Sequence, residues 1–182
     1  AMARKDPDFL TAFVVNHLVG GGGFASRLME EVREKRGLAY SVYSYLQTLR
    51  SAAIFSGSVA TRNDAVKTSI EIIREELRKV AQEGPNQTEF ANAKSYLIGS
   101  YALRFDTNVK IATQLLGLME EGFGPDYIRE RNALIEAITL EDAKRVAKRL
   151  LDVDNMIVTI VGKPEPLKPA SEKPEPVSAD RG

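Results

Sequence analysis

The chain has 182 residues, enough for one domain with a sizeable hydrophobic core; 43% of them are hydrophobic and 27% charged, the composition of an ordinary globular protein. Lysine and arginine together number 25, and so do aspartate and glutamate, so no overall charge draws the chain to nucleic acid or to an anionic membrane. Cysteine is absent, which excludes structural disulfides and thiolate catalysis.

The first predicted element is a buried helix over residues 8–19, because apolar side chains occur on almost every side of this segment. Asp6 or Asp8 is expected near its N-terminal cap. The uncharged run that starts in this helix contains Asn16, His17 and four glycines, which argues against a membrane span. As the single histidine of the chain, within an apolar helix, His17 is expected to be a satisfied core residue rather than a ligand.

Residues 20–45, GGGGFASRLMEEVREKRGLAYSVYSY, carry the densest pattern in the chain. Four consecutive glycines allow the backbone to adopt positive φ and to pass close to another chain or to a substrate. A short, heavily charged helix is predicted next, with Phe24, Leu28 and Val32 on one apolar stripe. Gly37 is expected to end this helix.

A strand is predicted over residues 38–46, with Tyr40 on the same face as Val42. Residues 53–60 are predicted to return as a second strand and to form a hairpin with the first. A third, short and buried strand is predicted over residues 156–161.

The rest of the chain is predicted to be helical, with amphipathic spacing and recognisable caps. Helices are expected from residue 61 or 63 to about 83, from 86 to about 105, from 106 or 107 to about 122, from 127 to 137 and from 139 to about 150. Gly84-Pro85 is expected to end the first, and Asn86 and Thr139 to begin capping boxes. In the third, the residues expected to face inward are Val109, Ala112, Leu115, Leu116 and Met119.

Three strands and six or seven helices predict an α+β domain, in which helices pack on one face of a small, mainly antiparallel sheet. Residues 1–162 are assigned to this single domain. Residues 163–182 contain five prolines in a polar context and are expected to form a disordered tail.

Arg33 is expected in the last turn of the short charged helix and Tyr40 near the start of the first strand, with a reversal at Gly37 between them. Such a reversal can bring a guanidinium and a phenol to the same side of a cleft. Together they offer donors suited to a peptide carbonyl or to the oxyanion that it becomes. The alternative from spacing alone is a solvated charged face, with Glu31 and Lys35 as an ordinary i,i+4 pair and Tyr40 as a strand aromatic.

The stretch GGGGFASRLMEEVREKRGLAYSVYS closely resembles the signature of the zinc-free half of the pitrilysin/insulinase family of zinc metallopeptidases, which includes mitochondrial processing peptidase. The resemblance extends over about residues 6–162. In that family an arginine, and a tyrosine seven residues later, reach into the active site of the zinc-bearing half. The matching residues here are Arg33 and Tyr40, because Arg36 stands four residues before Tyr40 and misses the spacing.

The resemblance implies that the chain closes, together with a zinc-bearing homologous half-domain or subunit, over an unfolded peptide. Zinc is expected in that partner and no cofactor in this chain. The family fold has a further strand just before the region where this chain starts, so the sheet is expected to lack its first strand and to leave an edge open or paired with another chain. Bacterial relatives occur in the cytoplasm and in the periplasm, and the sequence favours neither. The residues expected to lie against the substrate or the opposing half are Gly20, Gly21, Gly22, Gly23 and Phe24.

With one histidine and no cysteine, the sequence has no H-x-x-E-H motif or its inverse, and the isolated chain is not expected to hydrolyse peptides. The glycine run also lacks the G-K-[ST] ending of a phosphate loop. Two other functions remain open. One is a catalytically inactive structural or peptide-binding subunit of the same family, although the intact Arg33/Tyr40 pair argues against it. The other is a stand-alone peptide-binding module that uses an open sheet edge.

Overall fold

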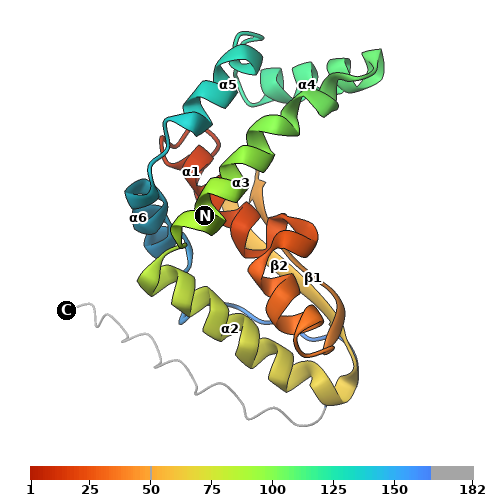
Figure 1. Ribbon diagram of the computed structural model, residues 1–182. Coiled ribbons are helices and arrows are strands. Elements are labelled where there is room, and N and C mark those ends of the chain that lie inside the picture. Colours follow the sequence, from red (N-terminus) through yellow and green to blue (C-terminus); the bar gives the residue numbers. More distant parts are fainter. Residues whose placement is uncertain (50, 165–182) are drawn as a thin grey trace, which may run out of the picture.

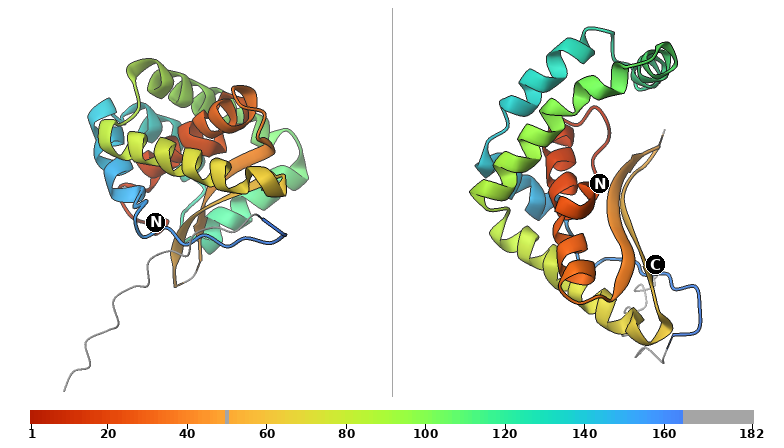
Figure 2. Two further views of the ribbon diagram at one scale, coloured as in Figure 1. Left: turned by 90° about the horizontal axis from the view of Figure 1, so that it is seen from below. Right: turned by 45° about the vertical axis from the view of Figure 1, so that its right-hand side comes forward.

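The structure, a computed structural model, describes residues 1–49 and 51–164. It has an α+β fold in which helices lie on one side of a two-stranded antiparallel hairpin, as Figures 1 and 2 show, and this confirms the predicted fold class. The tail predicted over residues 163–182 lies, from residue 165 on, outside the described residues. Within the described part, no helix is both long and apolar enough to span a membrane.

The helices and the hairpin follow one another in the order that the sequence predicts. The two strands are β1 (Ala39–Thr48) and β2 (Ala53–Thr61), and their register runs from Ser41 opposite Ala60 to Thr48 opposite Ala53. The α-helices are α1 (Phe9–Asn16), α2 (Val66–Glu83), α3 (Gln87–Gly99), α4 (Asn108–Glu120), α5 (Tyr127–Glu136) and α6 (Leu140–Leu150). Wider π-helical turns cover His17–Gly21 and Met29–Glu34, and tighter 3₁₀ turns cover Gly23–Ala25, Asn63–Ala65 and Tyr101–Phe105.

Both predicted capping boxes are confirmed. At the start of α3 the Asn86 side chain accepts a hydrogen bond from the Glu89 amide at 2.9 Å, and the Glu89 carboxylate accepts one from the Asn86 amide at 3.0 Å. Thr139 and Asp142 make the same reciprocal pair at the start of α6. Gly84 ends α2 with a φ of +75°, a conformation that favours glycine. These local signals therefore set where the helices begin and end.

The hydrophobic core is built around α1, which contacts α3, α5, α6 and β1. This central position explains why α1 is apolar on almost every side, since a helix surrounded by other elements has no face for water. Across from it, α6 follows the usual amphipathic pattern, with its predicted inner residues buried. The core residues on these two helices are Ala12, Val14, Val15, Ala143, Val146, Ala147 and Leu150.

The strand predicted over residues 156–161 is wrong. This segment has no strand pairing in the structure, and Ile157 and Val161 are 90% and 97% exposed. A strand needs a neighbour to pair its backbone N–H and C=O groups, and this segment pairs with neither strand of the described sheet. The described sheet thus has two strands rather than three, and each strand has one neighbour and one open edge.

The inward face predicted for α4 is also wrong. Val109, Leu116 and Met119 are 76%, 58% and 68% exposed, whereas the buried residue of this helix is Leu118. Figure 2 shows why, since α4 projects away from the body of the domain instead of lying on the core. The apolar spacing correctly predicts a helix there, but spacing alone does not say what covers the apolar face.

Candidate functional site

The first glycine of the run allows close packing of the chain on β1. Gly20 is buried, and a Cβ atom there would lie 2.5 Å from the Ser44 Oγ and 2.6 Å from the Ser44 amide nitrogen. The Ser44 hydroxyl in turn donates to the Asn16 Oδ1 at 2.9 Å in a buried hydrogen bond. Any side chain at position 20 would therefore push the π-helical turn away from the strand, and this gives Gly20 a structural role.

The next three glycines differ in exposure. Gly22 is half-buried, while Gly21 and Gly23 are exposed. Gly23 adopts a φ of +60°, and a Cβ atom there would have no heavy atom within 4 Å. Space for a contact with another chain therefore exists beside Gly23, and contact of Gly20 to Gly23 with a substrate stays a prediction.

Phe24 does not lie on the predicted apolar stripe. It sits in the 3₁₀ turn Gly23–Ala25, ahead of the charged helix, and is 68% exposed. Leu28 and Val32, the other predicted members of the stripe, are buried in the core as expected. Gly37 ends the helical segment with a φ of +59°, and the Leu38 amide donates back to the Val32 carbonyl at 3.0 Å, so the predicted reversal is confirmed.

A β-bulge sets the direction of Tyr40. Ala39 pairs with Thr61 and Ser41 with Ala60, so Tyr40 has no residue opposite it in β2. The extra residue shifts the alternation of side chains, and Ala39 and Val42 are both buried while Tyr40 is 82% exposed. The prediction that Tyr40 shares a face with Val42 is therefore wrong.

The structure brings Arg33, Phe24 and Tyr40 together from three different segments. The Arg33 Cζ lies 4.6 Å from the centroid of the Phe24 ring and 5.3 Å from that of the Tyr40 ring. Both distances are within the range of cation–π contacts. The only ion pair of Arg33 with a described residue joins its Nε to the Glu34 Oε1 at 3.6 Å, too long for a good hydrogen bond. Its fork of N–H donors thus remains available beside an exposed phenol.

The neighbouring basic residues donate hydrogen bonds to carboxylates of the same chain. The Arg36 Nη1 donates to the Glu31 Oε2 at 2.6 Å and to the Glu31 carbonyl at 2.7 Å, and the Lys35 Nζ donates to the Glu31 Oε1 at 2.6 Å. These hydrogen bonds lower the pKa of Glu31, so its carboxylate stays charged and keeps its partners. Arg27 binds the Glu89 carboxylate through two hydrogen bonds of 2.8 and 2.7 Å. Geometry thus favours Arg33 over Arg36, in agreement with the spacing argument.

The described residues do not fit a catalytic zinc ion. Among the residues that the structure describes, no group of three or more His, Cys, Asp or Glu side chains could hold a metal. The single histidine, His17, is half-buried and stacks on the Tyr96 ring with 4.9 Å between centroids. Burial lowers the pKa of His17, which favours its neutral form.

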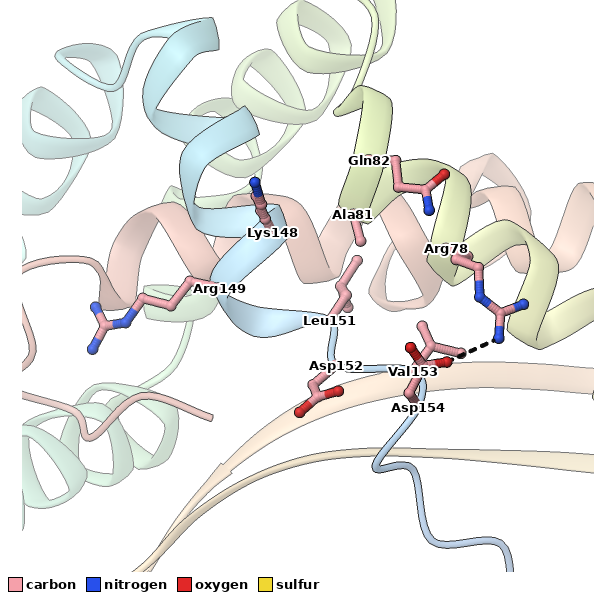
Figure 3. Close-up of a pocket in the computed structure, with 9 residues that line it drawn as sticks. All are labelled: Arg78, Ala81, Gln82, Lys148, Arg149, Leu151, Asp152, Val153 and Asp154. Carbon is pink, nitrogen blue, oxygen red and sulfur yellow. Dashed lines mark hydrogen bonds and ion pairs between the residues drawn. The ribbon is translucent and has the colours of Figure 1, made fainter. Parts of the chain in front are cut away.

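A hollow of about 360 Å³ lies at another place on the surface, between α2, α6 and the segment after α6 (Figure 3). It contains none of the predicted site residues. Across it the Arg78 Nη2 donates to the Asp154 Oδ1 at 3.2 Å, so its charged groups are already partly paired. Of the site residues predicted from the sequence, Phe24 and Tyr40 are exposed, Arg33 is partly exposed and Gly20 is buried.

Sequence reasoning missed two features of this surface. One is the position of Phe24 over Arg33, since nothing in the spacing of these residues indicates that the glycine run ends in a separate turn. The other is the β-bulge, which places Tyr40 on the exposed face of β1 together with Tyr43 and Tyr45. In a regular strand buried residues are two positions apart, but Ala39 and Val42 are buried and three apart, as a bulge between them requires.

Comparison with known proteins relates this fold to peptidases. The sequence profile of the family described as the peptidase M16 inactive domain matches residues 2–97. An uncharacterized zinc protease of Streptomyces coelicolor is 34% identical over 151 residues, which are 82% of this chain and 32% of that protein. A protein of Helicobacter pylori called "non-peptidase homolog YmxG" is 38% identical over 87 residues, 48% of this chain and 20% of that protein.

Among solved structures, a peptidase M16 inactive domain from Pseudomonas fluorescens superposes with a TM-score of 0.76 and 31% sequence identity, over 84% of this chain and 36% of that one. The chain thus spans about a third or less of the length of these relatives. The profile match covers just over half of the chain, including the glycine run and the whole hairpin, and the fold agrees along most of the rest. The chain therefore belongs to the peptidase M16 inactive domains, the zinc-free halves of the pitrilysin/insulinase family.

Proposed function

We propose that the chain is the zinc-free half of a zinc metalloendopeptidase, which closes over an unfolded peptide and supplies Arg33 and Tyr40 to the active site of a zinc-bearing partner domain. The observation that carries this proposal is the arrangement of these two residues. The Arg33 guanidinium lies 5.3 Å from the Tyr40 ring on an exposed surface, with its donors free of close ion pairs to described residues.

The chemistry of the pair suits amide hydrolysis. A guanidinium and a phenol can both donate hydrogen bonds to the carbonyl oxygen of a peptide, and these bonds strengthen as that oxygen becomes an oxyanion. The zinc of the partner would supply the activated water. Arg33 and Tyr40 would act on the substrate oxygen alone, and removing one such donor typically lowers kcat by a factor of about 100 to 1,000.

The length of the relatives supports a partner of this kind. The protein of Streptomyces coelicolor called a zinc protease is about three times as long as the region that this chain matches, which leaves room for a second, zinc-bearing half. For this chain, that half belongs either to the same polypeptide or to a second subunit. Phe24 contacts Arg33, and we propose that a peptide entering the closed pair would pass over Phe24 and the exposed Gly23 before it.

The test is to combine the chain with its zinc-bearing half and to measure cleavage of an unstructured peptide. Arg33→Ala and Tyr40→Phe are each expected to lower kcat about 100- to 1,000-fold. Arg36→Ala is the matched control, because Arg36 lies three residues away and is bound to Glu31, so its removal should leave kcat within about twofold. Normal turnover in both site variants would exclude this role for Arg33 and Tyr40.

A second function from another class is a catalytically inactive subunit that binds peptides or has a structural role. The relative of Helicobacter pylori called a non-peptidase homolog favours it, since it is 38% identical to this chain over 87 residues. If this function is the right one, the combined halves would bind an unfolded peptide without cleaving it. Even with a partner half that carries a complete zinc motif, no peptide cleavage that is lost in Arg33→Ala would then be observed.

A further inference from the structure

We infer that Phe24 is a positioning residue, whose ring holds the guanidinium of Arg33 beside the hydroxyl-bearing ring of Tyr40. This goes beyond a role for Phe24 as an apolar contact for the substrate. Its catalytic consequence rests on the proposed function, whereas the contact between the two side chains does not. The two parts can therefore be tested separately.

Two aromatic rings contact the same guanidinium. The Arg33 Cζ lies 4.6 Å from the Phe24 ring centroid and 5.3 Å from the Tyr40 ring centroid, so rings from two separate segments contact the same cation. The Arg33 side chain is 29% exposed although it lies on the protein surface, while the Phe24 and Tyr40 residues are 68% and 82% exposed. Phe24 is therefore mostly exposed to water, and it contacts Arg33.

The turn that carries Phe24 is well anchored. Ser26, which follows it, is 1% exposed, and its hydroxyl donates to the Gly23 carbonyl at 2.7 Å. The Ser26 amide donates to the same carbonyl at 3.0 Å. Gly23 has a φ of +60°, so the chain turns sharply just before the aromatic residue. These hydrogen bonds hold the backbone of Phe24 in place, so its ring can restrain the long, flexible side chain of Arg33.

A ring is a suitable restraint for an arginine that must act on a substrate. An ion pair fixes a guanidinium through its N–H groups and thereby uses the donors that a substrate would need, as Glu89 does with Arg27 and Glu31 with Arg36. A cation–π contact uses the face of the guanidinium instead and leaves the donors at its edge free. The Phe24 contact restrains Arg33, whose guanidinium donates no hydrogen bond to any described residue.

The kinetic test compares Phe24→Leu with Phe24→Tyr in the chain combined with its zinc-bearing half. Phe24→Leu keeps apolar bulk but removes the aromatic face, and it should lower kcat about threefold to tenfold with little change in KM. Phe24→Tyr should restore kcat. In an Arg33→Ala background, Phe24→Leu should cause no further loss, because the residue that it positions is already absent.

Other outcomes would overturn the inference. A Phe24→Leu enzyme with a raised KM and unchanged kcat would instead be a substrate-contact variant, and so would one whose effect persists in full without Arg33. Leu116→Ala on α4 is the control for loss of an exposed apolar side chain, because Leu116 is 58% exposed outside this cluster.

The contact itself is tested by NMR on the 182-residue chain, without any measurement of activity. Ring currents from Phe24 should shift the side-chain proton resonances of Arg33 upfield, and Phe24→Leu should remove most of that shift. Unchanged Arg33 resonances in Phe24→Leu would exclude the contact. If the shift is present but Arg33→Ala does not affect turnover, the contact stands and the proposed function fails.

Discussion

Gly20→Ala tests whether the close packing of the glycine run on β1 supports the fold. The new Cβ atom would lie 2.5 Å from the Ser44 Oγ and 2.6 Å from the Ser44 amide nitrogen, so a strand backbone atom and a buried hydroxyl would both have to move. Overpacking of this kind costs about 1–3 kcal/mol. Disturbing the hydrogen bond from Ser44 to Asn16 adds about 1 kcal/mol, and the better helix propensity of alanine returns up to about 1 kcal/mol.

The expected net loss is thus about 1–3 kcal/mol in the free energy of unfolding, measured by urea denaturation followed by circular dichroism. Gly117→Ala is the matched control, because Gly117 lies inside α4 and a Cβ there has no heavy atom within 4 Å. It should stabilise the chain by about 0.4–1 kcal/mol. A Gly20→Ala chain as stable as the wild type would refute the argument that position 20 admits no side chain.

Two further changes test the electrostatics and the caps. Hydrogen bonds from Arg145 and Arg149 hold the pKa of Asp8 at about 2, below the usual 3.8, so the stabilisation is present above about pH 4 and is lost as the pH falls toward 2. Asp8→Asn should therefore lower the free energy of unfolding by about 1 kcal/mol at pH 7. The urea midpoints of the variant and the wild type should converge as the pH approaches 2. A difference that stays constant over this pH range would contradict the role given to the Asp8 carboxylate. Thr139→Ala removes the hydroxyl that accepts a hydrogen bond from the Asp142 amide at the start of α6. It should lower the free energy of unfolding at pH 7 by about 1 kcal/mol. An unchanged urea midpoint would show that this cap is dispensable.

Local signals allowed the helices and the hairpin to be predicted from the sequence. Asn86 and Thr139 begin helices as capping-box residues, and Gly37 and Gly84 end helical segments with positive φ. In each case the deciding interactions join residues a few positions apart. Their physical effect is therefore visible in a short stretch of sequence.

The errors concern contacts between residues that are distant in the sequence. Residues 156–161 have the apolar composition of a buried strand, but they form one only if another strand pairs with them. The apolar spacing of α4 indicates a helix and says nothing about whether another element covers its apolar face. The exposed face of Tyr40 follows from a bulge in the pairing of β1 with β2, which no alternation pattern within β1 alone could reveal.

The candidate site was predicted in part. The resemblance to the family signature, with its seven-residue spacing, led to Arg33 and Tyr40, and in the structure the two side chains are in contact at the surface. The preference for Arg33 over Arg36 gains a physical reason from the structure, because Glu31 binds Arg36. The contact of Phe24 with Arg33 could not be predicted, since it depends on the turn that separates the glycine run from the charged helix.

The most direct test of the central claim is the single-turnover rate of peptide cleavage by the two combined halves at saturating substrate. With Arg33→Ala or Tyr40→Phe in this chain, that rate should fall about 100- to 1,000-fold while zinc binding by the partner is unchanged. Wild-type rates in both variants would contradict the claim that this chain contributes a guanidinium and a phenol to a metal centre in its partner.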